Sequence, residues 1–290
     1  MKKDAKPVNT VVGKSEGDRY PEDSREARLK GDPAEYHKHS GQHFFEARAG
    51  IRATQFYGKI RPGRQGSSTF DLRDDLGLKE YDYGPQLDFE LRVSPDWFCR
   101  FSYANSSASG NVYTSKSYLY QTTASGVGLD RAATLQPGAH IQSEVELDTL
   151  QFLAGYDVFK DLHWTVSPLV GFKEAILDVE VRVRDPAPPT DKPSDYYRKY
   201  DFLQGTPMLG CEVKYDFNAH FYTGISPVAF AWANYVYAGG QWFLGCNFDR
   251  HWGLRLGFDV DYLSITEDSQ RVFSGTGLLT GAYLQGVYGF

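Results

Sequence analysis

The stretch Ala282-Tyr-Leu-Gln-Gly-Val-Tyr-Gly-Phe290, with which the chain ends, is the most informative part of the sequence for the fold. In an extended strand, successive side chains point to opposite sides. One side of this strand would carry Ala282, Leu284, Gly286, Tyr288 and Phe290. The other side would carry Tyr283, Gln285, Val287 and Gly289. The stretch therefore predicts a β-strand with one apolar face that ends in an aromatic residue.

The same alternation recurs along the chain from His43 onward. In 252–262 the even positions are apolar and the odd positions are Gly, Arg or Asp. No helix accommodates such a period of two. The alternating runs predict ten strands, at 43–60, 82–94, 97–105, 142–159, 163–184, 201–217, 220–231, 235–249, 251–265 and 277–290.

Composition narrows the classes of protein. The chain has 290 residues, and no run of eighteen apolar residues that would predict a membrane-spanning helix. Alternating strands escape such a search, since only every second residue is apolar. Twenty Tyr, nineteen Phe and five Trp suit the aromatic girdles of a membrane barrel. A net charge of -6 argues against a nucleic-acid partner.

Four short polar breaks are each followed by an aromatic residue. They are Pro95-Asp-Trp97, Leu162-His-Trp164, Ala219-His-Phe221 and Arg250-His-Trp252, and longer connections lie between them. We interpret the breaks as tight turns on one rim and the long connections as loops on the other. The predicted membrane-interface aromatics are Trp97, Trp164, Phe221, Trp252, Tyr288 and Phe290.

The terminal strand and this asymmetry of turns resemble the bacterial single-chain outer-membrane β-barrels. The resemblance implies an all-β, antiparallel transmembrane β-barrel over 43–290, with about ten strands and eight or twelve as alternatives. It also implies a bacterial outer-membrane location with both termini in the periplasm, and a partner in the barrel-assembly machinery, which reads the terminal strand. We expect 1–42 to be a polar, periplasmic extension. The rival fold is a soluble β-sandwich or lipocalin-like barrel, whose apolar face would point inward.

If the apolar face meets lipid, the charged face lines the lumen. The predicted lumen-lining charges are Glu46, Arg48, Arg52, Asp88, Glu90, Arg92, Arg100, Lys173, Glu212, Lys214, Arg255, Asp259 and Asp261. Their signs are mixed, and the bore of a barrel of about ten strands is narrow. We therefore expect an ion-paired, largely occluded lumen, with a narrow pore for ions or small solutes as the alternative.

The sequence gives weaker support to an enzymatic function than to a scaffold or a pore. Some outer-membrane barrels of this size are omptin proteases or lipid-modifying enzymes, but no omptin motif maps onto the chain. Only His140 with Ser143 is placed for a hydrolase at the outer rim. His163, His220 and His251 are expected as turn residues at the opposite rim. We predict no cofactor, and no metal site despite the cluster His37, His39 and His43.

The long connections hold the remaining candidates. The segment 69–78, Thr-Phe-Asp-Leu-Arg-Asp-Asp-Leu-Gly-Leu, is either folded over or into the barrel mouth or is a plain surface loop. The Tyr-rich, Ser-rich stretch 105–140 suits contact with a protein or a glycan. Arg182, Arg184, Arg198 and Lys199 are expected near outer-leaflet headgroups, where they would contact lipopolysaccharide phosphates. The function expected first is a non-enzymatic scaffold that binds a partner through its loops or its extension, ahead of a pore and of a rim hydrolase.

Overall fold

A computed structural model describes residues 44–62, 68–78, 81–123, 130–184, 195–218, 220–232, 235–249, 251–265 and 273–289. The predicted extension 1–42, the histidines at 37, 39 and 43, and Phe290 lie outside these residues. No helix in the described part of the chain is long and apolar enough to cross a membrane.

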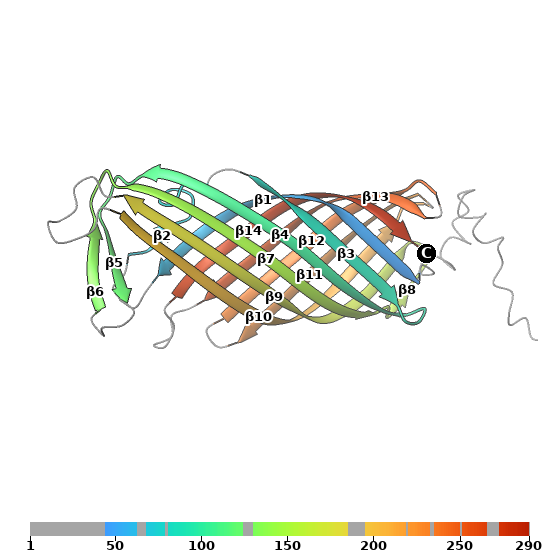
Figure 1. The fold of residues 1–290 in the computed structure, drawn as a ribbon. Coiled ribbons are helices and arrows are strands. Elements are labelled where there is room, and N and C mark those ends of the chain that lie inside the picture. Colours follow the sequence, from blue (N-terminus) through green and yellow to red (C-terminus); the bar gives the residue numbers. More distant parts are fainter. Residues whose placement is uncertain are drawn as a thin grey trace, which may run out of the picture.

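The chain folds into a closed, antiparallel β-barrel (Figure 1). Ten strands form the ring, in the order β1-β3-β4-β7-β9-β10-β11-β12-β13-β14 and back to β1. Their bounds are β1 Phe45–Pro62, β3 Asp82–Arg92, β4 Trp97–Tyr113, β7 His140–Tyr156, β9 Trp164–Arg184, β10 Asp195–Asp216, β11 Phe221–Trp232, β12 Tyr235–Asn247, β13 Trp252–Ile265 and β14 Phe273–Gly289. The two-residue strands β2 (Phe70–Asp71) and β8 (Phe159–Lys160) pair with β1 and β9. The predicted ring of ten strands is therefore confirmed.

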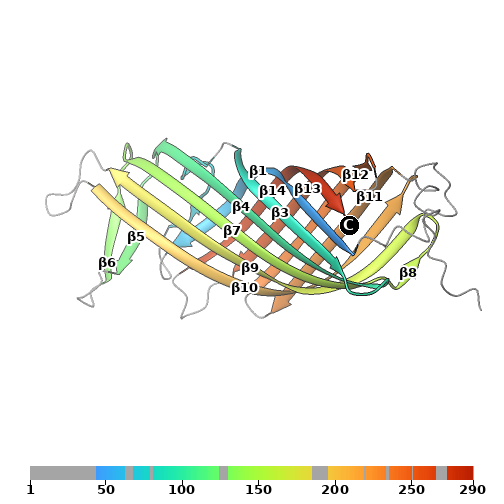
Figure 2. The same cartoon turned by 45° about the vertical axis from the view of Figure 1, so that its right-hand side comes forward.

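The main differences from the predicted strands lie at the long-loop rim. β4 continues to Tyr113, β10 begins at Asp195 and β14 begins at Phe273. The stretch predicted as one loop after Asn105 also holds a hairpin of β5 (Tyr118–Thr123) and β6 (Asp130–Leu135). The extension of β4 is rich in Ser, Asn and Gly on both faces, so alternation could not reveal it. Figure 2 shows that β7, β9 and β10 form a long wall leading to this hairpin.

Both described ends of the chain lie at the short-turn rim, where Figure 1 marks the C-terminus. Strand β1 pairs with β14 along its length, and Glu46 lies opposite Gly289. The first and last strands thus close the ring. An even number of strands requires both ends to fall on the same side.

The outer face of the barrel is apolar around its middle. Leu254, Leu256 and Phe258 point outward and are 40%, 50% and 44% exposed, whereas Arg255 between them is 2% exposed. A soluble barrel would have the reverse polarity, so the sandwich and lipocalin alternatives are wrong. Apolar surface of this extent on every strand is suited to hydrocarbon.

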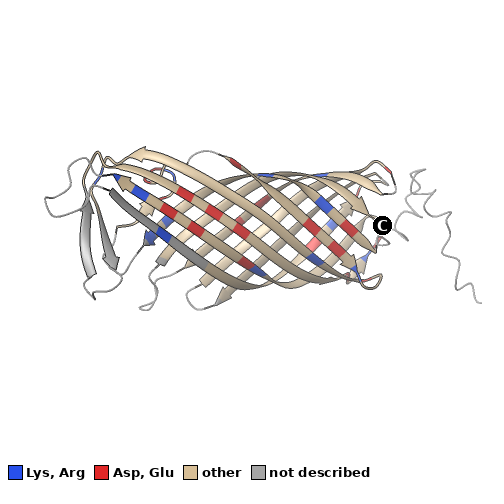
Figure 3. Ribbon diagram, viewed as in Figure 1, with Lys and Arg blue, Asp and Glu red and all other residues tan. Residues whose placement is uncertain are grey.

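The polarity of the interior changes along the barrel axis. Toward the short-turn rim the inward side chains include the charged residues, beside an apolar cluster that includes Phe98, Leu153, Leu169 and Met208. Toward the long-loop rim the inward side chains are mainly apolar. The apolar cluster toward the long-loop rim, which we call the inner apolar cluster, includes Phe56, Ile141, Val145, Val179 and Leu279. On the long wall the outward side chains at this level are acidic, which Figure 3 shows as red bands on β7 and β9.

This change of polarity corrects one prediction about β9. Phe172 and Leu177 have opposite parity, which suggested a β-bulge near Lys173–Ala175. The register of β9 with β7 and with β10 is unbroken through this stretch. Phe172 faces outward and Leu177 packs against the inner apolar cluster, so no bulge is needed.

The segment 69–78 folds into the barrel mouth. Leu72, Leu76 and Leu78 are buried in the inner apolar cluster, the last two with 2% and 1% exposure. Gly77 between them has φ of +74°, a backbone conformation that favours glycine. The inward hydroxyl of Ser143 donates to the carbonyl oxygen of Leu76 at 2.5 Å. This segment is thus part of the core and not a surface loop.

Candidate functional site

The centre of the charged half of the lumen is Arg100 on β4, which is 2% exposed. Its guanidinium lies 2.9 Å from the carboxylate of Glu90 on β3 and 2.8 Å from that of Glu212 on β10. Strands β3 and β4 are neighbours, but β10 is three strands away around the ring. Arg100 therefore joins two walls across the bore.

Further contacts extend this cluster around the lumen. Arg48 lies 2.5 Å from Glu46 and 3.0 Å from Glu90, while Lys214 lies 3.1 Å from Glu212. The hydroxyl of Ser226 donates to Glu212 at 2.6 Å. In the described residues, buried cations and carboxylates thus meet within hydrogen-bonding distance, which offsets their loss of hydration.

Arg92 closes the cluster at the short-turn rim. It lies 2.9 Å from Asp157 and 3.5 Å from Glu90. Asp157 follows β7 directly and also accepts hydrogen bonds or ion pairs from Ser167 at 2.6 Å and Lys160 at 3.0 Å. Burial alone would raise the pKa of Asp157, but these donors and the two cations hold it below its ordinary value.

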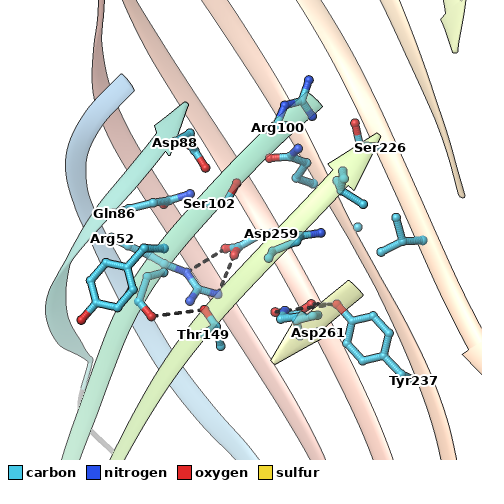
Figure 4. A pocket seen from close by; sticks show the side chains of 18 residues that line it. Arg52, Gln86, Asp88, Arg100, Ser102, Thr149, Ser226, Tyr237, Asp259 and Asp261 are labelled. Atoms are coloured by element: carbon cyan, nitrogen blue, oxygen red, sulfur yellow. Dashed lines mark hydrogen bonds and ion pairs between the residues drawn. The ribbon is translucent and has the colours of Figure 1, made fainter. Parts of the chain in front are cut away.

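A second cluster lies deeper in the barrel (Figure 4). Arg52 on β1 lies 2.5 Å from Asp259 on β13, and Lys173 on β9 lies 2.7 Å from Asp261. The Tyr237 hydroxyl donates to Asp261 at 2.5 Å. The two aspartates, paired in sequence, thus each face a cation of their own.

A polar cavity of about 70 Å³ lies between the two clusters. Arg52, Gln86, Asp88, Arg100, Asp259 and Asp261 are among its lining residues. Within the described residues, the buried Gln86 Oε1 atom has no hydrogen-bond partner. Space of this size accommodates about two water molecules, which would satisfy such a group.

Arg255 differs from the other lumen cations because aromatic rings surround it. Its guanidinium carbon lies 3.6 Å from the centre of the Phe243 ring and 5.9 Å from that of Tyr283, a cation–π arrangement. Its Nη2 atom donates to Gln241 at 3.4 Å. The last predicted lumen charge, Asp88, accepts from Gln285 at 2.5 Å.

Sequence reasoning did not identify several of these partners. Asp157, Tyr237, Gln285, Phe243 and Tyr283 all contact lumen charges but were not among the predicted residues. Four of them share the inward parity of their strands, which was available in the sequence. Their roles were missed because the search was restricted to charged side chains.

The short-turn rim repeats one arrangement of aromatic residues. Trp97, Trp164 and Trp252 point outward and lie 4.6–4.8 Å, between ring centres, from Tyr156, Tyr215 and Tyr288 at the end of a neighbouring strand. Phe221, which is 48% exposed, occupies the equivalent place on β11. Outward aromatic rings at one level are typical of a membrane–water interface.

The residue before each of these aromatics fastens the turn to the next strand end. The Nδ1 atoms of His163, His220 and His251 bond to the backbone carbonyl oxygens of Asp216, Asn247 and Gly289 at 2.8, 3.0 and 2.8 Å. In each case the amide of that same residue donates back to the histidine carbonyl oxygen, at 2.7–2.9 Å. We call these three reciprocal pairs the rim latches.

Comparison with known proteins identifies the architecture. No protein-family model matches the chain, and no curated protein matches its sequence. The outer membrane protease OmpT from Escherichia coli is similar in structure, with a TM-score of 0.60, 10% identity, and coverage of 87% of this chain and 98% of OmpT. The chain has the fold of a bacterial outer-membrane β-barrel.

A more distant match is Ail, the attachment invasion locus protein of Yersinia pestis. It has a TM-score of 0.32 and 8% identity, and the alignment covers 84% of this chain and 99% of Ail. That score is too low to support any argument. At such low identities, the comparisons establish the fold of this outer-membrane barrel and not its activity.

The basic residues predicted to meet lipopolysaccharide lie far along the long wall. Arg182 and Arg184 are exposed on β9, and Lys199 is exposed on β10, 3.5 Å from Asp178. Arg198 is in β10, but its side chain lies outside the described part of the structure. Between these residues and the apolar belt, the outer face carries carboxylates, among them Asp178 and Glu180.

The structure does not bring the hydrolase candidates His140 and Ser143 together. The two residues lie on opposite faces of β7, since Ser143 is buried and donates inward to Leu76. The Nε2 atom of His140 bonds instead to the side-chain oxygen of Asn111. A hydroxyl nucleophile and its base must be in hydrogen-bond reach, which this geometry prevents.

Proposed function

We propose that this outer-membrane barrel is a non-enzymatic scaffold, closed to solutes by its own lumen charges, which binds a partner at its long-loop end. The observation that supports this most is Arg100, buried between Glu90 and Glu212 from opposite walls of the bore. A conducting lumen would need space and water along this path. Here the path is occupied by paired side chains.

A second barrier supports the same proposal. On the long-loop side of the charged half, the inner apolar cluster fills the upper lumen. It includes Leu72, Leu76 and Leu78 from segment 69–78, the mouth segment. An ion crossing it would have to lose its hydration without polar partners, which is costly. A narrow pore is therefore the second candidate function. One measurement distinguishes the scaffold from the pore.

The test is single-channel conductance of the purified barrel in planar bilayers. The scaffold proposal expects no steady conductance from the wild type. It expects open events from a triple variant with Glu90→Ala, Arg100→Ala and Glu212→Ala, and none from a control with Glu144→Ala, Glu180→Ala and Arg182→Ala on the outer wall. Steady ion-selective conductance from the wild type would establish the pore instead.

The orientation follows from the asymmetry of the rims. Outer-membrane barrels place short turns in the periplasm and long loops outside the cell. We propose the same here, so that both termini are periplasmic and the β5–β6 hairpin is external. The long wall and this hairpin would then form the surface for a protein partner. Co-purification that is lost when 114–139 is replaced by a short turn would support this surface.

We propose further that Arg182, Arg184, Arg198 and Lys199 contact lipopolysaccharide phosphates, because guanidinium and ammonium groups bind phosphate well. Neutralising all four to Gln should lower the lipopolysaccharide retained on purification. The matched control is the double variant Glu144→Gln with Glu146→Gln, which neutralises acidic residues on the same wall. This control should retain at least as much lipopolysaccharide as the wild type. Unchanged retention in the fourfold variant would contradict the contact.

The rim hydrolase is the remaining alternative. OmpT is a protease with a similar fold, but fold alone does not carry an activity. In this barrel Asp259 and Asp261 are both ion-paired inside the lumen, and His140 bonds to Asn111. Hydrolysis of peptides or lipid by the wild type, lost on His140→Ala, would support an enzyme over a scaffold.

A further inference from the structure

The upper lumen contains a second cavity, and its lining is apolar. The cavity has a volume of about 140 Å³ and lies between β1, β7, β9, β13 and β14, on the long-loop side of the Lys173–Asp261 pair. Its lining includes Phe56, Leu147, Leu177, Val179, Ile265 and Leu279. Protein interiors hold few spaces larger than one water molecule, so a cavity of this size calls for an explanation.

The polar groups at the floor of this cavity are already partnered. Lys173 lies 2.7 Å from Asp261 and donates to the Tyr237 hydroxyl at 3.1 Å. The hydroxyls of Thr206 and Tyr235 bond to each other. Water is stable in a cavity only where it finds two to four polar partners, and this lining offers few free ones.

Two glycines line the cavity on its β14 side. They are Gly277 and, beside it, Gly275. A Cβ atom added to Gly277 would meet no heavy atom within 4 Å. Part of the space is thus left by the missing side chain of Gly277, which is an inward position of β14.

We propose that this upper-lumen cavity is a binding site for an uncharged, apolar molecule of about the size of benzene. An apolar cavity of roughly 150 Å³ lined by Leu, Ile and Phe is known to stay dry and to bind benzene, so the volume and chemistry here are suited to the same class of ligand. A charged ligand is excluded because it would lose its hydration against aliphatic side chains. The paired charges of Lys173 and Asp261 close the cavity on the short-turn side. The proposal does not depend on whether the barrel is a scaffold.

The experiment uses the full chain in lipid nanodiscs and fluorobenzene as the probe, followed by ¹⁹F NMR. Partition into lipid gives a signal that rises without saturation, whereas the cavity gives a saturable one. Gly277→Leu fills the cavity. Gly286→Leu is the matched control, because it adds the same side chain on the same strand but on the outer face.

The expected result is saturable binding to the wild type and to Gly286→Leu, and binding at least tenfold weaker in Gly277→Leu. Ala175→Leu fills the same cavity from β9 and gives a second test if Gly277→Leu does not fold. Unsaturable partition in every variant would overturn the site. Saturable binding that survives in both filled variants would overturn it as well.

Discussion

At the residue scale, Arg100 is the side chain on which most of the lumen cluster depends. It lies within 3 Å of two carboxylates and is 2% exposed. Removing one member of a buried ion pair lowers stability by more than the pair itself contributes, because the partner remains buried and charged. Without Arg100, Glu90 and Glu212 would each lose their shortest ion pair, and only longer ones, such as those with Arg48 and Lys214, would be left to offset their buried charges.

Arg100→Ala should therefore lower the free energy of unfolding by about 3–5 kcal/mol. Urea unfolding in lipid vesicles, followed by tryptophan fluorescence, measures it. The control is Arg182→Ala on the outer wall, which should stay within about 0.5 kcal/mol of the wild type. If Arg100→Ala lowers the free energy of unfolding no more than the control does, the ion pairs of Arg100 do not stabilise the barrel.

Asp157 gives a prediction about pH. Its pKa is lowered in the folded barrel, so its contribution to stability is present above the unfolded pKa of about 3.9 and is lost as pH falls through the folded value. Asp157→Asn should thus destabilise the barrel at pH 7, with a gap to wild type that narrows below about pH 4. Unfolding at a series of pH values measures the gap. A gap of constant size from pH 7 to pH 3 would contradict the ion pairs with Arg92 and Lys160.

At the element scale, the rim latches explain why short turns with His before an aromatic residue recur. Each histidine joins its own turn to the end of the next hairpin by two hydrogen bonds, one from the ring and one from the backbone. In the first turn Asp96 takes this place, and its carbonyl oxygen accepts from the amide of Asp157 at 2.8 Å. The backbone half of the latch is therefore independent of the side chain.

His251→Phe isolates the ring half of one latch, since it keeps an aromatic ring near Tyr288 and removes the donor. We expect a loss of about 0.5–1.5 kcal/mol, the usual net value of one hydrogen bond. His251→Ala should lose more, because the contact with Tyr288, 5.9 Å between ring centres, also disappears. Equal stability of His251→Phe and wild type would show that the ring bond is not a source of stability.

The strands themselves were largely predictable from the sequence, and the reason is the period of two. In the membrane belt the two faces differ in polarity, so parity alone separates Arg255 from Leu254 and Leu256. Where both faces are polar, as in β4 beyond Asn105, the pattern carries no such information. In β9 the alternation continues, but from Leu177 onward the apolar residues face inward and the polar residues face outward.

At the scale of the whole molecule, this inversion shows that the barrel has two kinds of environment. Within the belt, lipid covers the outer face, and the lumen holds ion pairs beside an apolar cluster around Phe98 and Met208. Along the projecting part of the long wall, water meets Glu144, Glu146 and Glu180 outside, and an apolar core fills the inside, as in a soluble protein. The sequence left the placement of 69–78 open between the barrel mouth and the surface. The upper cavity was not predictable, because it depends on this second environment and on side chains from distant strands.

The two environments predict a sharp difference in the reactivity of cysteines. Cys99, Cys211 and Cys246 are free and alternate with inward residues on β4, β10 and β12, which places them on the outer face within the belt. In lipid vesicles a charged maleimide should not label them until the protein is unfolded, since the reagent does not enter hydrocarbon. Glu146→Cys and Glu180→Cys, each made after the three native cysteines are changed to Ala, should react rapidly. Labelling of the native cysteines as fast as at positions 146 and 180 would mean that the apolar face meets water, and the membrane assignment would fail.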